Sequence, residues 1–160
     1  MRKPKIYLDT SVISHLDAPD TPEKMDDTLR LWEKIQAGTY DVVLSDVVLI
    51  ELEDCFEPKK SHLASSLGKI NYELVEPDDN TDALAGKFVE LGILKEKSFD
   101  DCRHIASALL AGCDIIVSWN FKHIVNAKTI KGAKVIAAME GHKDIMICSP
   151  GMLLEEADYE

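Results

Sequence analysis

Residues 101–118 read DCRHIASALLAGCDIIVS, an amphipathic stretch followed by a short apolar run. Apolar residues recur every three or four positions in the first part, which predicts a helix over 101–112. The run IIVS at 115–118 is typical of a buried strand. The same alternation along the chain predicts further strands at 6–8, 42–44, 72–75 and 134–137. It also predicts helices near 22–37, 46–57, 59–70 and 80–95. A last short strand near 145–148 is compatible with the pattern.

This alternation of helices and strands predicts an α/β domain with a mainly parallel sheet and right-handed connections. No repeat or flexible linker divides the 160 residues, so we expect one domain over residues 1–150 and an acidic tail at 151–160. The tail is either disordered or covers an edge strand. Because parallel sheets bind ligands beyond the carboxyl ends of their strands, the residues that follow each strand are the candidate site residues.

The composition is acidic, with 18 basic and 29 acidic residues and a formal net charge of −11. This balance argues against broad electrostatic capture of nucleic acid, but it allows binding through metal ions or through one basic strip. Five lysines could form that strip or a merely solvated face: Lys122, Lys128, Lys131, Lys134 and Lys143. The chain start lacks a signal-peptide core, and no apolar run approaches the roughly 18–20 residues that span a bilayer, so we expect a cytoplasmic protein without a membrane partner. The four separated cysteines are expected to be reduced thiols.

Asp9 and Glu51 are the first two candidate site residues. Asp9 directly follows the strand at 6–8, where it can serve a site or cap the next helix. Glu51 lies in the middle of the apolar face of the helix at 46–57, where an unpaired carboxylate costs several kcal/mol. We favour a site role for Glu51 over an ion pair with an internal partner.

Periodicity separates the adjacent acids Asp100 and Asp101. Asp101 shares the face of Ile105, Ala108 and Leu109 and is predicted to point inward, whereas Asp100 points outward. The alternative for Asp101 is a capping box with Ser98, since the pattern Ser-x-x-Asp precedes an apolar run. His104 follows one turn later and is interpreted as a partly buried, hydrogen-bonded histidine rather than a ligand.

Asn120 follows the strand at 115–118, so its side-chain oxygen can serve a cation or cap the next segment. Its neighbours Trp119 and Phe121 are interpreted as packing residues. Four oxygen-bearing side chains thus come from four separated elements: Asp9, Glu51, Asp101 and Asn120. Such an oxygen-only set suits Mg²⁺ or Mn²⁺ rather than zinc, and the cation would let an acidic pocket act on an anionic polymer.

Four stretches carry a resemblance to a known family: YLDTSVIS at 7–14, SDVVLIEL at 45–52, DCRHIASALLAGCDIIVS at 101–118 and WNFKHI at 119–124. Together they resemble the PIN-domain family of metal-dependent ribonucleases, in particular the VapC-type toxins. The resemblance implies a three-layer α/β/α sandwich with a mainly parallel central sheet. By it, Asp9, Glu51 and Asp101 correspond to the metal-binding acids, and Asn120 stands where a fourth acid is usual. This departure removes one negative charge and should weaken any second metal ion.

The resemblance also implies an endoribonuclease that hydrolyses RNA phosphodiesters and leaves a 5′-phosphate and a 3′-hydroxyl. Asp9 and Asp101 would hold Mg²⁺ or Mn²⁺ directly, Glu51 directly or through water, and Asn120 would assist. A homodimer and an inhibitory antitoxin protein are the implied partners.

The alternative is a catalytically weak PIN-like domain that binds RNA or protein. A phosphatase with a nucleophilic Asp9 is disfavoured because Ser11 stands where a second acid is needed. The glycines form no dinucleotide-binding or P-loop motif.

Overall fold

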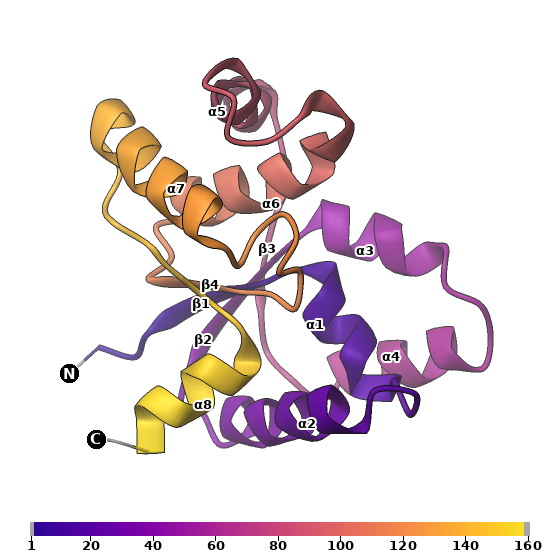
Figure 1. Cartoon of the computed structure of the whole chain (residues 1–160). Coiled ribbons are helices and arrows are strands. Elements are labelled where there is room, and N and C mark those ends of the chain that lie inside the picture. Colours follow the sequence, from indigo (N-terminus) through magenta and orange to yellow (C-terminus); the bar gives the residue numbers. More distant parts are fainter. Residues whose placement is uncertain (1, 159–160) are drawn as a thin grey trace.

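Five short strands form one parallel sheet in the order β3-β2-β1-β4-β5 (Figure 1). The computed structural model describes the backbone of residues 2–158 and the side chains of residues 2–155. The strands are β1 (Lys5–Leu8), β2 (Asp41–Ser45), β3 (Glu73–Val75), β4 (Ile115–Val117) and β5 (Met146–Cys148). Ile6 of the central strand pairs with Val42 on one side and Ile115 on the other. The predicted parallel sheet is confirmed, and the short strand expected near 145–148 is β5.

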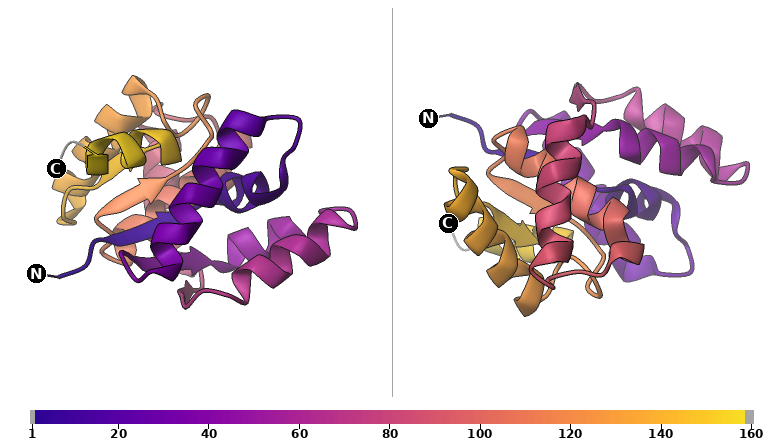
Figure 2. Two further views of the ribbon diagram at one scale, coloured as in Figure 1. Left: turned by 90° about the horizontal axis from the view of Figure 1, so that it is seen from below. Right: turned by 90° about the horizontal axis from the view of Figure 1, so that it is seen from above.

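Helices cover both faces of the sheet, as the three-layer sandwich requires (Figures 1 and 2). They are α1 (Thr10–Ser14), α2 (Pro22–Gln36), α3 (Asp46–Glu53), α4 (Lys59–Leu67), α5 (Asp79–Glu90), α6 (Phe99–Leu110), α7 (Ala127–Glu140) and α8 (Pro150–Asp158), with 3₁₀ turns η1 (His15–Asp17) and η2 (Glu96–Ser98). Ile6 and Leu8 pack with α1, α2 and α8, whereas Tyr7 faces the core formed with α5, α6 and α7. Alternate residues of β1 thus enter opposite cores.

The strand predicted at 134–137 is wrong, because these residues lie inside α7. Ala133, Ile136 and Ala137 are buried at helical spacing, while Lys134 between them is exposed. Start and stop signals frame the longer helix. Asn126 accepts a hydrogen bond from the backbone of Thr129, and Gly141 ends the helix with a φ of 76°. The short apolar run is therefore one face of a helix.

The first part of the acidic tail belongs to α8, which packs against α2 and buries Leu153 and Leu154. Residues 159–160 lie outside the described residues. All four cysteine thiols are free, as expected, and three of them are buried. Within residues 2–158, no helix has the length and apolar character needed to cross a membrane.

Candidate active site

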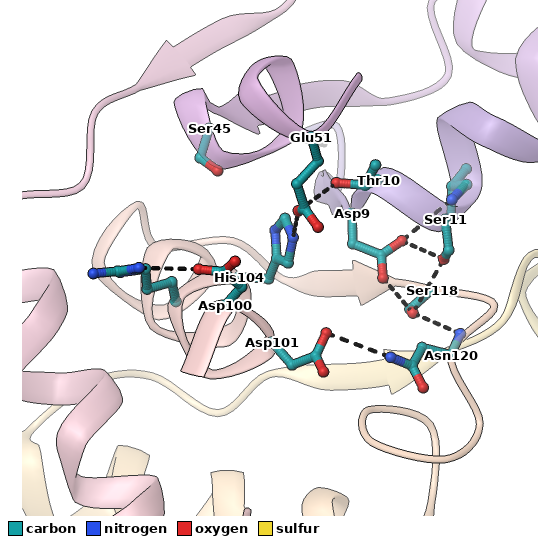
Figure 3. Close-up of polar contacts among 12 residues, drawn as sticks. Asp9, Thr10, Ser11, Ser45, Glu51, Asp100, Asp101, His104, Ser118 and Asn120 are labelled. Carbon is teal, nitrogen blue, oxygen red and sulfur yellow. Dashed lines mark hydrogen bonds and ion pairs between the residues drawn. The ribbon is translucent and has the colours of Figure 1, made fainter. Parts of the chain in front are cut away.

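Asp9 lies at the carboxyl end of β1 with only 3% of its surface exposed (Figure 3). Its Oδ1 accepts hydrogen bonds from Ser11 Oγ at 2.6 Å and from the backbone of Val12 at 3.2 Å, so it caps α1. Its Oδ2 accepts a hydrogen bond from Ser118 Oγ at 2.5 Å, across from the end of β4. Burial raises the pKa of Asp9 although His104 and the hydrogen bonds oppose the shift. The capping role is confirmed, and the buried carboxylate has no direct ion pair with any residue that the structure describes.

Glu51 of α3 is held from two sides (Figure 3). Its Oε1 accepts a hydrogen bond from Thr10 Oγ1 at 2.8 Å, and His104 Nε2 lies 2.8 Å from the same oxygen. Burial by itself raises the pKa of Glu51, but the hydrogen bond and charge of His104 outweigh it, so the pKa is lowered. Glu51 therefore has the internal partner that the alternative interpretation requires.

His104 is the buried centre of a hydrogen-bond chain. Burial lowers its pKa, but Glu51 and the charges of Asp9 and Asp101 raise it overall, which favours the doubly protonated ring. Its Nδ1 lies 2.6 Å from Tyr7 Oη, which in turn lies 2.7 Å from Ser45 Oγ. The interpretation of His104 as a satisfied histidine is confirmed. Sequence reasoning missed Tyr7, although a tyrosine within a fully apolar strand needs a buried partner for its hydroxyl.

Asp101 lies in the first turn of α6 and points inward, whereas Asp100 is exposed and pairs with Arg103, as predicted. Asp101 Oδ2 lies 2.9 Å from His123 Nδ1. Burial raises the pKa of Asp101, and the hydrogen bond from His123 together with the charge of His104 offsets this only in part. The capping-box alternative is wrong. The chain enters α6 from η2, so Ser98 lacks the extended backbone of a capping residue and its side chain makes no cap bond.

Asn120 contacts both Asp101 and the backbone of His123. Its Nδ2 donates to Asp101 Oδ1 at 3.4 Å, and its Oδ1 accepts a hydrogen bond from the backbone of His123 at 2.9 Å. Asn120 therefore caps its own turn and also touches an acid of the site. Sequence reasoning missed His123 and Ser118, which fix Asp101 and Asp9 in place. The motif residues WNFKHI do contain His123, but only the fold shows that it faces Asp101.

The packing prediction for the two aromatic neighbours of Asn120 is confirmed for one of them. Trp119 is 8% exposed, and its Nε1 donates to Thr28 Oγ1 at 2.8 Å. Phe121 keeps 47% of its surface exposed and meets Trp119 edge-on. Phe121 is thus a surface residue beside the site.

The donor set can be tested for its fit to a divalent cation. In the described part of the chain, no three histidine, cysteine, aspartate or glutamate side chains converge closely enough to hold an ion together. Mg²⁺, however, keeps several waters and needs only one or two carboxylates. Asp9 and Asp101 supply two carboxylates, and the charge of Asp9 raises the pKa of Asp101. A cation bound by them would offset this repulsion.

Comparison with known proteins agrees with this geometry. A family model described as PIN domain matches residues 6–123. The fold is similar to a chain in the crystal structure of VapBC2 from Rickettsia felis bound to a DNA fragment from their promoter. That similarity has a TM-score of 0.52 and 14% identity over 91% of this chain and 98% of that chain. No curated protein matches the sequence. PIN domains are generally nucleases. Since the family model covers most of the sequence and the fold agrees, this chain belongs to the PIN-domain family.

Proposed function

We propose that this protein is an endoribonuclease that uses Mg²⁺ or Mn²⁺ to hydrolyse RNA phosphodiesters, and that it is the toxin of a toxin–antitoxin pair. The observation that carries the proposal is the pair Asp9 and Asp101. Asp9 is buried at the carboxyl end of the parallel sheet, and its charge raises the pKa of Asp101, a partly exposed carboxylate from a separate element. A divalent cation bound by the two carboxylates would offset this repulsion.

The proposed roles follow from the hydrogen bonds of each side chain. Asp9 and Asp101 would hold the ion, Glu51 would reach it directly or through water, and Asn120 would assist. When bound, the ion would activate water and offset the charge of the phosphate. Ser11 and Ser118 fix the rotamer of Asp9.

Two histidines orient the remaining acids. His123 contacts Asp101, and His104 contacts Glu51 through Nε2 and Tyr7 through Nδ1. We expect the products to carry a 5′-phosphate and a 3′-hydroxyl.

The nuclease proposal is tested with an end-labelled, mixed-sequence, single-stranded RNA incubated with the protein and Mg²⁺ or Mn²⁺. We expect cleavage that chelation by EDTA abolishes, with product ends that a ligase requiring a 5′-phosphate accepts. Cleavage that persists in EDTA, or products with a 2′,3′-cyclic phosphate, would contradict the proposed chemistry.

The toxin role rests on the similarity of the fold to a chain of the VapBC2 complex. By analogy we propose a homodimer that is inhibited by an antitoxin protein. Induction of the wild-type chain in a bacterial host should arrest growth, and induction of Asp101→Asn should not. Equal growth of the two cultures would contradict the toxin role.

A second function is favoured by one observation. Asn120 supplies no negative charge, and its Oδ1 is already engaged by the backbone of His123. A catalytically weak PIN domain that binds RNA or protein would show tight Mn²⁺ binding by calorimetry and no turnover. Binding together with turnover would exclude this second function.

A further inference from the structure

A groove next to the acids concentrates positive charge in an otherwise acidic chain. It is lined by residues of the segment between α5 and α6 and of the segment that leads into α7, and it has a volume of about 620 Å³. Lys95 and Lys97 line one wall, and Lys122 and Lys128 line the other. Glu96 is the one carboxylate among the lining residues. All four lysines are exposed, and none forms an ion pair with any residue that the structure describes.

The lysines of the strip predicted from the sequence have different surroundings in the structure. Lys134 pairs with Asp144 at 2.9 Å and Lys143 pairs with Asp114 at 2.7 Å, so these two charges are already matched. Lys122 and Lys128 instead face the groove. Unmatched lysines gathered in one concave surface repel one another, and an anionic ligand would relieve that repulsion.

His123 connects the groove to the acids. It lines the groove, and its Nδ1 lies 2.9 Å from Asp101 Oδ2. A polyanion held by the lysines would therefore pass directly beside Asp101. Chemistry on a phosphodiester needs such a neighbouring cationic surface here, because the net charge of −11 repels the substrate elsewhere.

We propose that this lysine groove binds the sugar–phosphate backbone of single-stranded RNA on one side of the scissile bond. The inference rests on the proposed function and deepens it by assigning the substrate track. The lysines would bind phosphates, so binding is independent of sequence and depends strongly on salt. An acidic peptide would match the same charges, but the connection to Asp101 through His123 favours a phosphodiester ligand.

The test measures binding of a short fluorescein-labelled oligouridylate by anisotropy in EDTA, where no cleavage is expected. Lys122→Glu/Lys128→Glu and Lys95→Glu/Lys97→Glu alter the two walls separately. The matched control is Lys3→Glu/Lys69→Glu, which makes the same charge change in another cavity of about 620 Å³, one that lies away from the acids. All six side chains are exposed, and circular dichroism checks that each variant folds.

We expect each groove variant to weaken binding roughly tenfold or more and the control to leave it nearly unchanged. The slope of log affinity against log salt should fall by about 0.7 for each phosphate that no longer has a lysine partner, hence by roughly 1.4 for a pair of lysines. Lys122→Gln/Lys128→Gln should weaken binding in the same way but to a smaller extent.

Several results would overturn the groove assignment: equal weakening by the control, absence of RNA binding by the wild type, or displacement of the RNA by polyglutamate at a lower charge concentration than by unlabelled RNA. Cleavage assays with Mg²⁺ separate this inference from the nuclease proposal. Wild-type cleavage with unchanged KM in both groove variants would refute the groove alone. Selective weakening of RNA binding in a chain that never cleaves RNA would support the groove and refute the nuclease.

Discussion

Asn120→Asp restores the fourth acid that is usual at this position and tests the electrostatics of the site. In the present chain Asn120 Nδ2 donates to Asp101 Oδ1 across 3.4 Å. The substitution replaces this donor with a second carboxylate, so a hydrogen bond becomes a repulsion. Two unit charges about 4 Å apart interact by about 1 kcal/mol in water and about 4 kcal/mol at an effective dielectric constant near 20. Because Asp101 is partly exposed, we expect a decrease of about 1–3 kcal/mol in the free energy of unfolding at neutral pH without metal.

The assay is urea denaturation in EDTA and again in Mn²⁺. The substitution should increase the stabilisation by Mn²⁺, since the added charge raises affinity for the ion. The penalty in EDTA should disappear at low pH, because repulsion raises the folded-state pKa of the pair and the folded protein then gains by binding a proton. Asn71→Asp is the control, since Asn71 is exposed and lines the cavity of Lys3 and Lys69. An unchanged stability in EDTA would refute the proximity of the two side chains, and a destabilisation that Mn²⁺ fails to reverse would refute the metal site.

Three further predictions concern the packing and charge of the core. Glu51→Gln keeps the acceptor oxygen but removes the charge, so we expect a folded protein that cleaves no RNA; full activity would contradict the role of Glu51. The loss of unfolding free energy in Glu51→Gln relative to wild type, measured by urea denaturation across pH, should be greatest between the lowered pKa of Glu51 and the raised pKa of His104. The contribution of Glu51 to stability is fully present above its unfolded-state pKa near 4.5 and is lost as the pH falls through its lower folded-state pKa. The contribution of His104 is fully present below its unfolded-state pKa near 6.5 and is lost as the pH rises through its higher folded-state pKa. A deficit that does not change with pH would argue against this ion pair. Tyr7→Phe removes the hydroxyl that lies between His104 and Ser45, so the free energy of unfolding, measured by thermal unfolding, should fall by about 1–3 kcal/mol. An unchanged stability would contradict the buried hydrogen-bond chain through Tyr7. Gly132→Ala places a methyl carbon 2.5 Å from a carbon of Ile93, so the cost of overpacking, about 1–3 kcal/mol, should exceed the helix-propensity gain of about 1 kcal/mol. In the control Gly86→Ala the added carbon meets nothing within 4 Å, so this variant should be neutral or stabilising. Equal effects of the two substitutions in urea denaturation would contradict the close approach of α7 to Ile93.

The sheet could be predicted from the sequence because its strands are short apolar runs, largely buried in β1, β2 and β4, and are separated by helices with clear periodicity. The run KVIA at 134–137 misled because four apolar residues are equally compatible with a strand and with one face of a helix. The capping signals at Asn126 and Gly141 decide the matter, and they lie outside that window.

The candidate acids could be selected from the sequence because Asp9 directly follows a strand, and helical periodicity places Glu51 and Asp101 on inward faces. Their partners could not, because His123 meets Asp101, and Ser118 meets Asp9, only through long-range contacts of the fold. The contact of Tyr7 with His104 is equally long-range. The pairing of Lys134 with Asp144 likewise depends on where α7 places the lysine, whereas Lys122 lies in the segment before α7 and lines the groove.

Asp101 is central to the proposed metal-dependent nuclease site, and its neighbour Asp100 supplies the matched control. Asp101 contacts His123 and Asn120, whereas Asp100 is exposed and pairs with Arg103. We would measure the rate of RNA cleavage in Mg²⁺ and Mn²⁺ for Asp101→Asn beside Asp100→Asn. We predict that Asp101→Asn abolishes nearly all cleavage and that Asp100→Asn cleaves at a rate close to wild type. Cleavage that survives in Asp101→Asn, or that is abolished equally in both variants, would contradict the role of Asp101.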